Sequence, residues 1–252
     1  PDAARLETEQ ENTMQAYTVI NGKDIASLAL VTREPQALGP HDVRVRINAV
    51  SLNFRDLMVA RGDYLQGASS PVIPASDAAG EVIEVGKAVT RFAPGDRVMG
   101  SFFPDWIDGD ATPATTRVAP GAATDGVLST ERVFAETALA ATPPSLSDEQ
   151  ASTLPCAAVT AWNALFVAGG AKAGHTALFL GTGGVSVWGL QLAKAAGLRA
   201  IITSSSASKL ERARAMGADG LINYRDTPDW QDEALRLTDG EGAHVVLSII
   251  HI

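Results

Sequence analysis

The feature that most restricts this chain is residues 176–186, where an apolar run leads directly into a turn that contains Gly181, Gly183 and Gly184. Glycines in such a turn let the backbone approach a pyrophosphate, and a helix beginning near Gly184 points its free N–H groups at the phosphates. The pattern that follows predicts a helix over 185–196, a strand over 199–203, a helix over 207–216 and a strand over 220–223. This βαβαβ order predicts a dinucleotide site, and the alternative is a glycine turn in an α/β domain without a cofactor.

The end of the second predicted strand indicates which dinucleotide is bound. No acidic residue stands where one would bind the ribose of NAD; Ser204, Ser205 and Ser206 occupy that place and Lys209 follows. Hydroxyl groups and a cation suit the 2′-phosphate of NADPH, which a carboxylate would repel. We therefore favour NADPH over NADH, the alternative being a serine-rich helix start with Ser206 as its N-cap.

Composition argues against several classes of function. The 252 residues are 46% hydrophobic and include 23 Gly and 13 Pro, which is typical of one large or two ordinary turn-rich α/β domains. A formal net charge of −9 opposes general affinity for nucleic acid or an anionic membrane. No apolar run approaches the ~18 residues of a membrane span. The single cysteine, Cys156, allows no intramolecular disulfide and suits a reducing compartment, so we expect a cytoplasmic protein.

Upstream of the glycine turn the sequence no longer shows the alternation of strand and helix patterns. Short alternating strands are predicted over 16–20, 28–32, 43–52, 79–85 and 97–100, separated by glycine and proline turns. Such a series predicts a small β-barrel-type domain. Residues 101–123 show no clear period, and we expect a long surface loop there, which is a candidate lid.

We place the domain boundary near residue 143, where two prolines precede a helical pattern. Residues 147–150 resemble a capping box, and a linking helical region is expected over 151–167. The expected domains are thus 14–143 and 144–252. Residues 1–13 are acidic and lack an apolar core, so we expect a disordered arm and no targeting signal.

Several motifs in order resemble one family. They are residues 53–56 (NFRD), 74–82 (PASDAAGEV), 92–98 (FAPGDRV), 154–162 (LPCAAVTAW) and the turn at Gly181. Together they resemble the medium-chain dehydrogenase/reductase superfamily, in particular its zinc-free branch of quinone oxidoreductase-like proteins, whose members are often named zinc-binding alcohol dehydrogenases. The resemblance implies an N-terminal GroES-like catalytic domain and a Rossmann domain with a doubly wound parallel sheet, with substrate and nicotinamide meeting between them.

The residues argue against a catalytic metal. In zinc-dependent relatives a Cys is expected at the place of Asn53 and a His at the place of Ser76, and only Cys156 falls near a ligand position. One soft ligand cannot hold Zn²⁺, which takes three protein ligands and an open fourth position. We therefore expect no metal site and interpret Cys156 as a small buried apolar residue.

Without a metal, hydrogen-bond donors must polarise the substrate, which favours an activated acceptor such as a quinone or an α,β-unsaturated carbonyl compound. The resemblance places Asn53 and Asp56 at the substrate end, makes Tyr64 a donor to the developing enolate and puts Thr160 beside the nicotinamide. Three of them have a structural alternative: Asp56 as the cap of a helix starting near Leu57, Thr160 as a helical core residue, and Tyr64 as a rim aromatic. Arg55 and Asp77 are expected to form a supporting ion pair.

The cofactor-binding candidates fall into two groups. The turn contributes Gly181, Thr182, Gly183, Gly184 and Val185. The resemblance places Lys209 and Tyr224 around the adenosine 2′-phosphate and ribose, with Ser204 or Ser205 supplying a hydroxyl.

Four Rossmann strands can be counted, the last over 244–249, whereas a complete member of the family continues for further strands and a return to the catalytic domain. We therefore expect a chain truncated at its C-terminus, and a homodimer only if those strands are present elsewhere. The favoured function is a zinc-independent NADPH-dependent oxidoreductase acting on a small quinone or enone. The alternatives are a zinc-free alcohol or ketone oxidoreductase and a catalytically idle dinucleotide-binding protein.

Overall fold

The computed structural model describes residues 13–64 and 71–249. All but the last residue of the expected arm over 1–13 lies outside these ranges. The chain divides into two compact units between Cys156 and Ala157. Within the described ranges, no helix is both long and apolar enough to cross a membrane.

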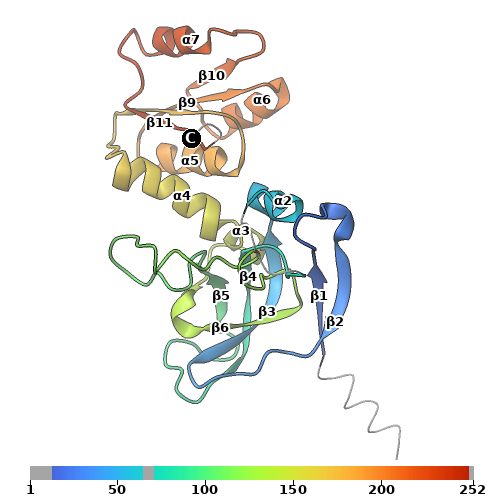
Figure 1. Ribbon diagram of the computed structural model, residues 1–252. Helices are drawn as coiled ribbons and strands as arrows, with labels where there is room; N and C mark the ends of the chain where they lie inside the picture. The colour runs from blue at the N-terminus through green and yellow to red at the C-terminus, as the bar shows by residue number, and fades with distance from the viewer. Residues whose placement is uncertain (1–12, 65–70, 250–252) are drawn as a thin grey trace, which may run out of the picture. The chain divides into compact units, whose positions relative to one another are not determined.

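The N-terminal unit is built from antiparallel strands (Figure 1). A hairpin pairs β1 with β2, and a five-stranded sheet has the order β6-β3-β4-β5-β7. The five strands predicted from the sequence are confirmed within two residues at each end, whereas β6 and β7 were not predicted and helix α2 was considered only as an alternative, with a start near Leu57. The strands and the helix are β1 (Met14–Thr18), β2 (Ala29–Arg33), β3 (Asp42–Ser51), α2 (Phe54–Arg61), β4 (Asp77–Val85), β5 (Arg97–Gly100), β6 (Glu131–Ala135) and β7 (Leu139–Ala141).

The sheet closes over an apolar core that includes Val43, Val45, Val82 and Val98. Gly80 lies where β4 passes closest to β3, and a Cβ there would sit 2.0 Å from the carbonyl oxygen of Arg46. Because no side chain fits that gap, only glycine permits this approach of the two strands.

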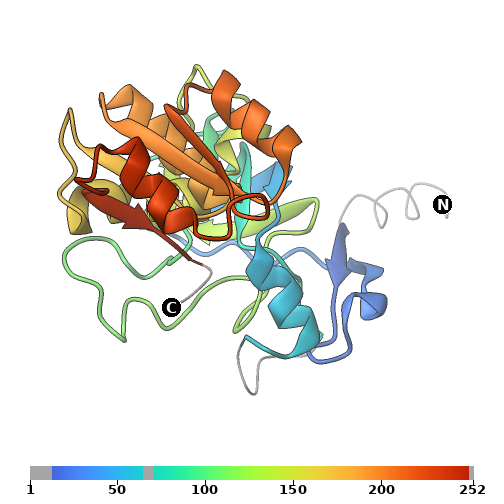
Figure 2. The ribbon, with the colours of Figure 1, turned by 90° about the horizontal axis from the view of Figure 1, so that it is seen from above.

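Residues 101–119 contain no helix or strand, as the absence of a clear period predicted, whereas residues 119–122, at the end of the surface loop expected over 101–123, are buried. Figure 2 shows this part of the chain, in green, as a wide loop. A second apolar cluster, which includes Val59, Val72 and Ala122, packs α2 against the segment that follows the loop.

The linking region is helical but irregular. Helix α3 (Asp148–Ala151) starts with the expected capping box, in which Gln150 N–H donates to Ser147 Oγ at 3.2 Å and Ser147 N–H donates to Gln150 Oε1 at 3.0 Å. Helix α4 (Val159–Trp162) then stands between two π-helical turns, Leu154–Ala158 and Asn163–Ala168. An extra residue in a helical turn often marks a functional segment.

The expected boundary at residue 143 precedes the division observed at Cys156. Asp148 explains the difference, because its carboxylate accepts hydrogen bonds from Asn48 at 2.8 Å and from Arg97 Nη2 at 2.6 Å. These contacts attach α3 to β3 and β5 of the N-terminal unit.

The C-terminal unit contains a parallel sheet with the order β10-β9-β8-β11. Alternate residues of its strands point to opposite faces: Phe179 and Ile202 pack with α5 and α6, while Leu178 and Ile201 pack on the side of α7. Helices therefore cover both faces, which confirms the doubly wound arrangement. The elements are β8 (Thr176–Phe179), α5 (Gly184–Ala195), β9 (Arg199–Ser204), α6 (Ala207–Ala215), β10 (Gly220–Asn223), α7 (Trp230–Leu237) and β11 (Val245–Leu247).

Candidate functional site

The turn after β8 is held in shape by hydroxyl groups of β9. Gly181 has a φ of 87°, a left-handed conformation that favours glycine, and its N–H donates to Thr203 Oγ1 at 3.0 Å. The hydroxyl oxygens of Thr182 and Ser204 lie 3.0 Å apart. Thr203 and Ser204 are both buried. The neighbouring strand therefore fixes the backbone of the turn.

Gly183 is the N-cap of α5, and the protein itself gives no reason for a glycine there. Its φ of −80° is open to any residue, and an added Cβ would meet no atom within 4 Å. The N–H groups of the first turn of α5 lack partners within the helix. Ser186, at the third position of the glycine motif, donates to the Leu180 carbonyl at 3.3 Å. Open space in front of unpaired N–H groups at a helix start fits a phosphate.

The serines at the end of β9 differ in their hydrogen-bond partners. Ser206 caps α6 as expected, since its Oγ accepts a hydrogen bond from Lys209 N–H at 3.4 Å. Ser204 Oγ accepts a hydrogen bond from Ser206 N–H at 3.2 Å in addition to its contact with Thr182, so this hydroxyl is already bound within the protein. Ser205 is half-buried, and Lys209 is exposed.

Tyr224 directly follows β10 and is exposed. Its N–H donates to the Ser204 carbonyl at 3.2 Å, so its backbone lies beside the end of β9. The structure therefore brings the candidates for the adenosine end to one edge of the parallel sheet.

In the N-terminal unit, Asn53 and Asp56 meet at the start of α2. Asn53 is the N-cap of α2, and its N–H donates to Asp56 Oδ2 at 2.7 Å. Asp56 is therefore the third residue of a helix that begins at Phe54, and not the cap of a helix starting near Leu57. Asp56 Oδ1 and Asn53 Nδ2 are buried and have no hydrogen-bond partner within the described ranges. Burial raises the pKa of Asp56, although the Asn53 N–H and the charge of Arg55 oppose the shift. A carboxyl group in this state is suited to hold a proton.

A second carboxyl group, Asp77, is fully buried at the start of β4. Ser76 Oγ donates to its Oδ1 at 2.5 Å, and the Cys156 N–H donates to its Oδ2 at 3.1 Å. Burial raises the pKa of Asp77, the hydrogen bonds and the nearby Asn53 amide oppose this, and the charge of Asp56 adds to it. Asp56 and Asp77 are therefore close enough to disfavour simultaneous ionisation.

Arg55 and Tyr64 form a stack with Phe102. The guanidinium carbon lies 4.8 Å from the Tyr64 ring centre and 4.9 Å from that of Phe102, and Nη1 donates to the Pro120 carbonyl at 2.8 Å. Within the described ranges, the expected ion pair between Arg55 and Asp77 is not formed, since the guanidinium makes these contacts in its place. Arg55 thus fastens α2 to both ends of the segment 101–123.

Thr160 lies in α4 of the C-terminal unit and is exposed, in contrast to the core position considered as its structural alternative. The structure therefore brings together Asn53 and Asp56 and places Tyr64 against Arg55, whereas Thr160 belongs to the C-terminal unit. Sequence reasoning missed Thr203; its position at the end of a predicted strand, level with the glycine turn, was the available signal.

Two family models match the chain. Residues 39–144 match the alcohol dehydrogenase GroES-like domain, and residues 184–251 match a domain described as zinc-binding dehydrogenase. Among solved structures, a Sinorhizobium meliloti protein assigned as an alcohol dehydrogenase is 44% identical with a TM-score of 0.85, over 94% of this chain and 70% of that one. The chain belongs to the medium-chain dehydrogenase/reductase superfamily.

Other members of the superfamily extend the comparison. A zinc-type alcohol dehydrogenase-like protein of Schizosaccharomyces pombe is 45% identical over 217 residues, which are 85% of this chain and 63% of that protein. The Escherichia coli quinone oxidoreductase complexed with NADPH is 25% identical with a TM-score of 0.73, over 90% of this chain and 63% of that one. The chain thus spans somewhat less than two thirds of the length of these two relatives.

The residues of this superfamily member do not fit a catalytic zinc. Asn53 is no zinc ligand, and Ser76 directs its hydroxyl to Asp77. Burial, together with the charge of Asp77, raises the pKa of the Cys156 thiol to about 12, and this thiol is the one soft ligand among the three positions. Across the parts of the chain that the structure describes, no group of three or more His, Cys, Asp or Glu side chains could hold a metal ion.

Proposed function

We propose that this chain is part of an NADPH-dependent oxidoreductase that reduces a quinone or an α,β-unsaturated carbonyl compound without zinc. The observation that carries the proposal is the turn between β8 and α5, where the open space at Gly183 faces a helix start. The similarity to a quinone oxidoreductase complexed with NADPH supports it. Bound NADPH would supply the hydride that the substrate accepts at carbon.

The C-terminal unit would hold the cofactor through three kinds of contact and one supporting residue. The N–H groups of Gly184 and Val185 would bind the pyrophosphate, since they stand at the start of α5 with the positive end of its dipole. Ser205 and Lys209 would bind the 2′-phosphate, because within the described ranges neither side chain makes a hydrogen bond or an ion pair with the protein. Tyr224 would lie against the adenosine, and Ser204 would act by bracing the turn.

The N-terminal unit would supply the polar groups for the substrate. The Asn53 amide and the Tyr64 hydroxyl would donate hydrogen bonds to the oxygen on which negative charge develops. Asp56 Oδ1 would hold the proton that the reduced substrate takes up, because burial raises the pKa of this carboxyl group and leaves Oδ1 without another partner. Thr160 is proposed to lie beside the nicotinamide when the cofactor is bound.

The absence of zinc ligands favours an activated substrate. A quinone or an enone delocalises the charge left by hydride addition onto oxygen, so hydrogen bonds suffice to stabilise it. An unactivated ketone needs a stronger electrophile, which a metal ion would provide. The residues around Asp77 offer hydrogen bonds and no metal ligand.

The experiment is to follow the absorbance of NADPH after adding a quinone, an enone, a simple ketone or a simple alcohol with NADP⁺. We expect turnover with the quinone or the enone, and none with the other two. Turnover of only the ketone and the alcohol would favour the alcohol dehydrogenase alternative, which the names of the S. pombe and S. meliloti relatives suggest. Binding of NADPH with no turnover of any compound would favour an idle dinucleotide-binding protein.

We also propose that the protein acts in the cytoplasm on small molecules and that it forms a homodimer. The single cysteine, which allows no intramolecular disulfide, supports a reducing compartment. Sedimentation analysis of the purified protein tests the dimer, and a monomer at all concentrations would contradict it.

A further inference from the structure

The segment that leads into β4 has a strained backbone. Ala75 is fully buried and has a φ of 68°, a left-handed conformation that is unfavourable for residues other than glycine. Two glycines pack closely against it: a Cβ at Gly121 would lie 2.6 Å from the Ala75 carbonyl oxygen, and one at Gly126 would lie 2.0 Å from it. Strain of this kind persists only where the surroundings enforce it, and it is often found at functional sites. The residues that follow Ala75 are therefore candidates for a role beyond packing.

Asp77 joins this segment to the π-helical turn Leu154–Ala158. Its Oδ1 accepts a hydrogen bond from Ser76 Oγ at 2.5 Å, and its Oδ2 accepts one from the Cys156 N–H at 3.1 Å. Because Asp77 is fully buried, its carboxyl group cannot exchange these donors for water. The carboxyl group thus fixes the backbone of the turn at Cys156.

The next residue of the turn packs against the start of α5. Ala157 directly follows Cys156, and a Cβ added at Gly184 would lie 3.7 Å from Ala157 Cβ, which is an ordinary van der Waals contact. Ala157 also belongs to the same apolar core as Val185. Gly184 and Val185 are the residues whose N–H groups are proposed to bind the pyrophosphate. A displacement of Ala157 would therefore reach the phosphate-binding turn.

A hydrogen bond, a peptide bond and a packing contact thus lead in sequence from Asp77 to Gly184. We propose that Asp77 is a positioning residue for the cofactor, which holds the Cys156 N–H and thereby sets the place of Ala157 against the start of α5. This inference rests on the proposed cofactor site. The form of the turn supports it, because π-helical turns are frequent at functional sites.

The test combines two measurements on the 252-residue chain: a fluorescence titration with NADPH, and NMR spectra of the cofactor-free chain that record the amide signals of Gly184 and Val185. Asp77→Ala removes the acceptor of the Cys156 N–H. We expect both amide signals to move and the Kd for NADPH to rise about 3- to 30-fold, the range for coupling carried by packed residues. Asp77→Asn keeps an oxygen that accepts this N–H, so it should preserve the Kd within about twofold.

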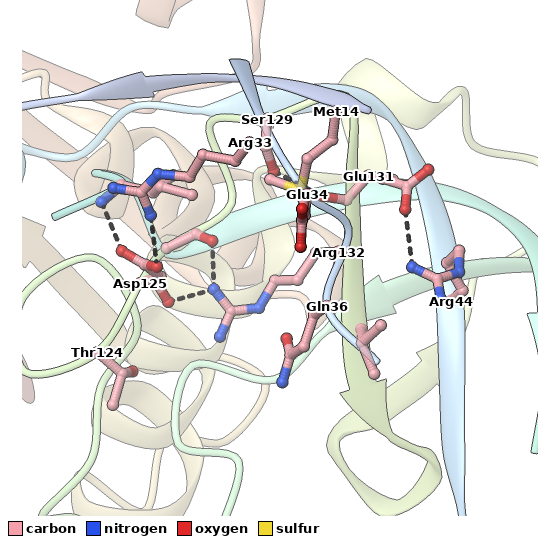
Figure 3. A pocket seen from close by; sticks show the side chains of 13 residues that line it. Met14, Arg33, Glu34, Gln36, Arg44, Thr124, Asp125, Ser129, Glu131 and Arg132 are labelled. Carbon is pink, nitrogen blue, oxygen red and sulfur yellow. Dashed lines mark hydrogen bonds and ion pairs between the residues drawn. The ribbon is translucent and has the colours of Figure 1, made fainter. Parts of the chain in front are cut away.

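Two control variants leave the contact with the π-helical turn in place. Ser76→Ala removes only the partner of Asp77 Oδ1. Asp125→Ala removes another carboxylate that accepts a backbone N–H, from Ile73 at 2.9 Å, and that pairs with Arg33 in the pocket of the N-terminal unit shown in Figure 3. Both variants should lower the unfolding free energy in urea, but they should leave the two amide signals of α5 and the Kd for NADPH unchanged.

A further variant keeps the carboxyl group, in case Asp77→Ala does not fold. Ala157→Gly takes away the methyl group that packs against Gly184, and the Kd for NADPH should rise about two- to fivefold. Three results would each overturn the proposal: unaltered amide signals of α5 in folded Asp77→Ala, equal affinity losses in Asp77→Ala and Ser76→Ala, or an unaltered Kd in Ala157→Gly. If the unaltered chain binds no NADPH, the proposed function fails, whereas the amide signals still decide the role of Asp77.

Discussion

The substitution Gly183→Ala should affect cofactor binding and folding stability differently. Gly183 has a φ of −80°, and no atom lies within 4 Å of the position that its Cβ would take. The protein alone should therefore accept alanine. We expect its unfolding free energy to be unchanged or to rise by about 0.4–1 kcal/mol, because alanine restricts the unfolded chain.

Cofactor binding should respond in the opposite direction. If the pyrophosphate binds at the start of α5 as proposed, the methyl group would take up part of the open space beside it. Overpacking of this kind costs about 1–3 kcal/mol, and since about 1.4 kcal/mol corresponds to a factor of ten, the Kd for NADPH should rise roughly 5- to 150-fold.

The assay pairs a fluorescence titration of NADPH with urea unfolding of the same samples. Gly95→Ala is the matched control: Gly95 also has open space at its Cβ, but its φ is 95° and it lies in the N-terminal unit. Alanine there should lower the unfolding free energy by about 1–2 kcal/mol and leave the Kd unchanged. If Gly183→Ala binds NADPH as tightly as the unaltered protein, the turn does not bind the pyrophosphate.

Four further outcomes are expected. Lys209→Ala should weaken NADPH binding by roughly one to two orders of magnitude and leave NADH binding nearly unchanged, and equal losses in the two titrations would refute a 2′-phosphate contact. Gly80→Ala should lower the unfolding free energy in urea by about 3 kcal/mol, since its Cβ would overlap the Arg46 carbonyl, and a stable variant would contradict that geometry. Burial opposes ionisation of Asp219, but hydrogen bonds from Lys194 at 2.8 Å and from the Ala200 N–H outweigh it and hold its pKa below the usual 3.8; these contacts therefore stabilise the fold fully above the unfolded pKa, and that stability is lost as the pH falls through the lower folded pKa. In the variant Asp219→Asn the unfolding free energy should depend less on pH in this range. If it depends on pH as in the unaltered protein, other groups cause the loss of stability in acid. Dialysis against EDTA should leave turnover of a quinone or an enone unchanged, and recovery of lost activity on adding zinc would show a metal requirement.

Local patterns predicted the parts of the fold that local interactions determine. The strand, the glycine turn and the helix over 176–195 are contiguous, and the expected β8, α5 and β9 are confirmed. The N-cap at Ser206 was likewise predictable from the sequence, because an N-cap side chain bonds to a residue only three positions away.

The missed elements depend on distant partners. Strand β6 pairs with β3, and β7 pairs with β5, so their pairing joins residues far apart in the sequence. Helix α2 begins with Phe54, which is 72% exposed, and so its apolar residues do not follow one face. The π-helical turns insert a residue into a pattern that reads as an ordinary helix.

The candidate site shows the same limit. Asn53 and Asp56 were predictable as neighbours because both stand in one helix turn. The stack on Arg55 was not, since its rings come from Tyr64 and Phe102, and the cation that the sequence assigned to an ion pair is held by aromatic faces.

The Ser204 hydroxyl bonds both to Thr182 and to the Ser206 N–H, and this limits how the proposed coenzyme preference could change. A carboxylate at the end of β9 is the usual means of selecting NAD. At position 204 it would enter a buried site and break the brace on Thr182, so the gain in discrimination would come with a loosened phosphate loop. Ser205 is only half-buried and is not part of the contact with Thr182. A shift toward NADH, in evolution or in the laboratory, should therefore begin at Ser205 and spare its neighbour.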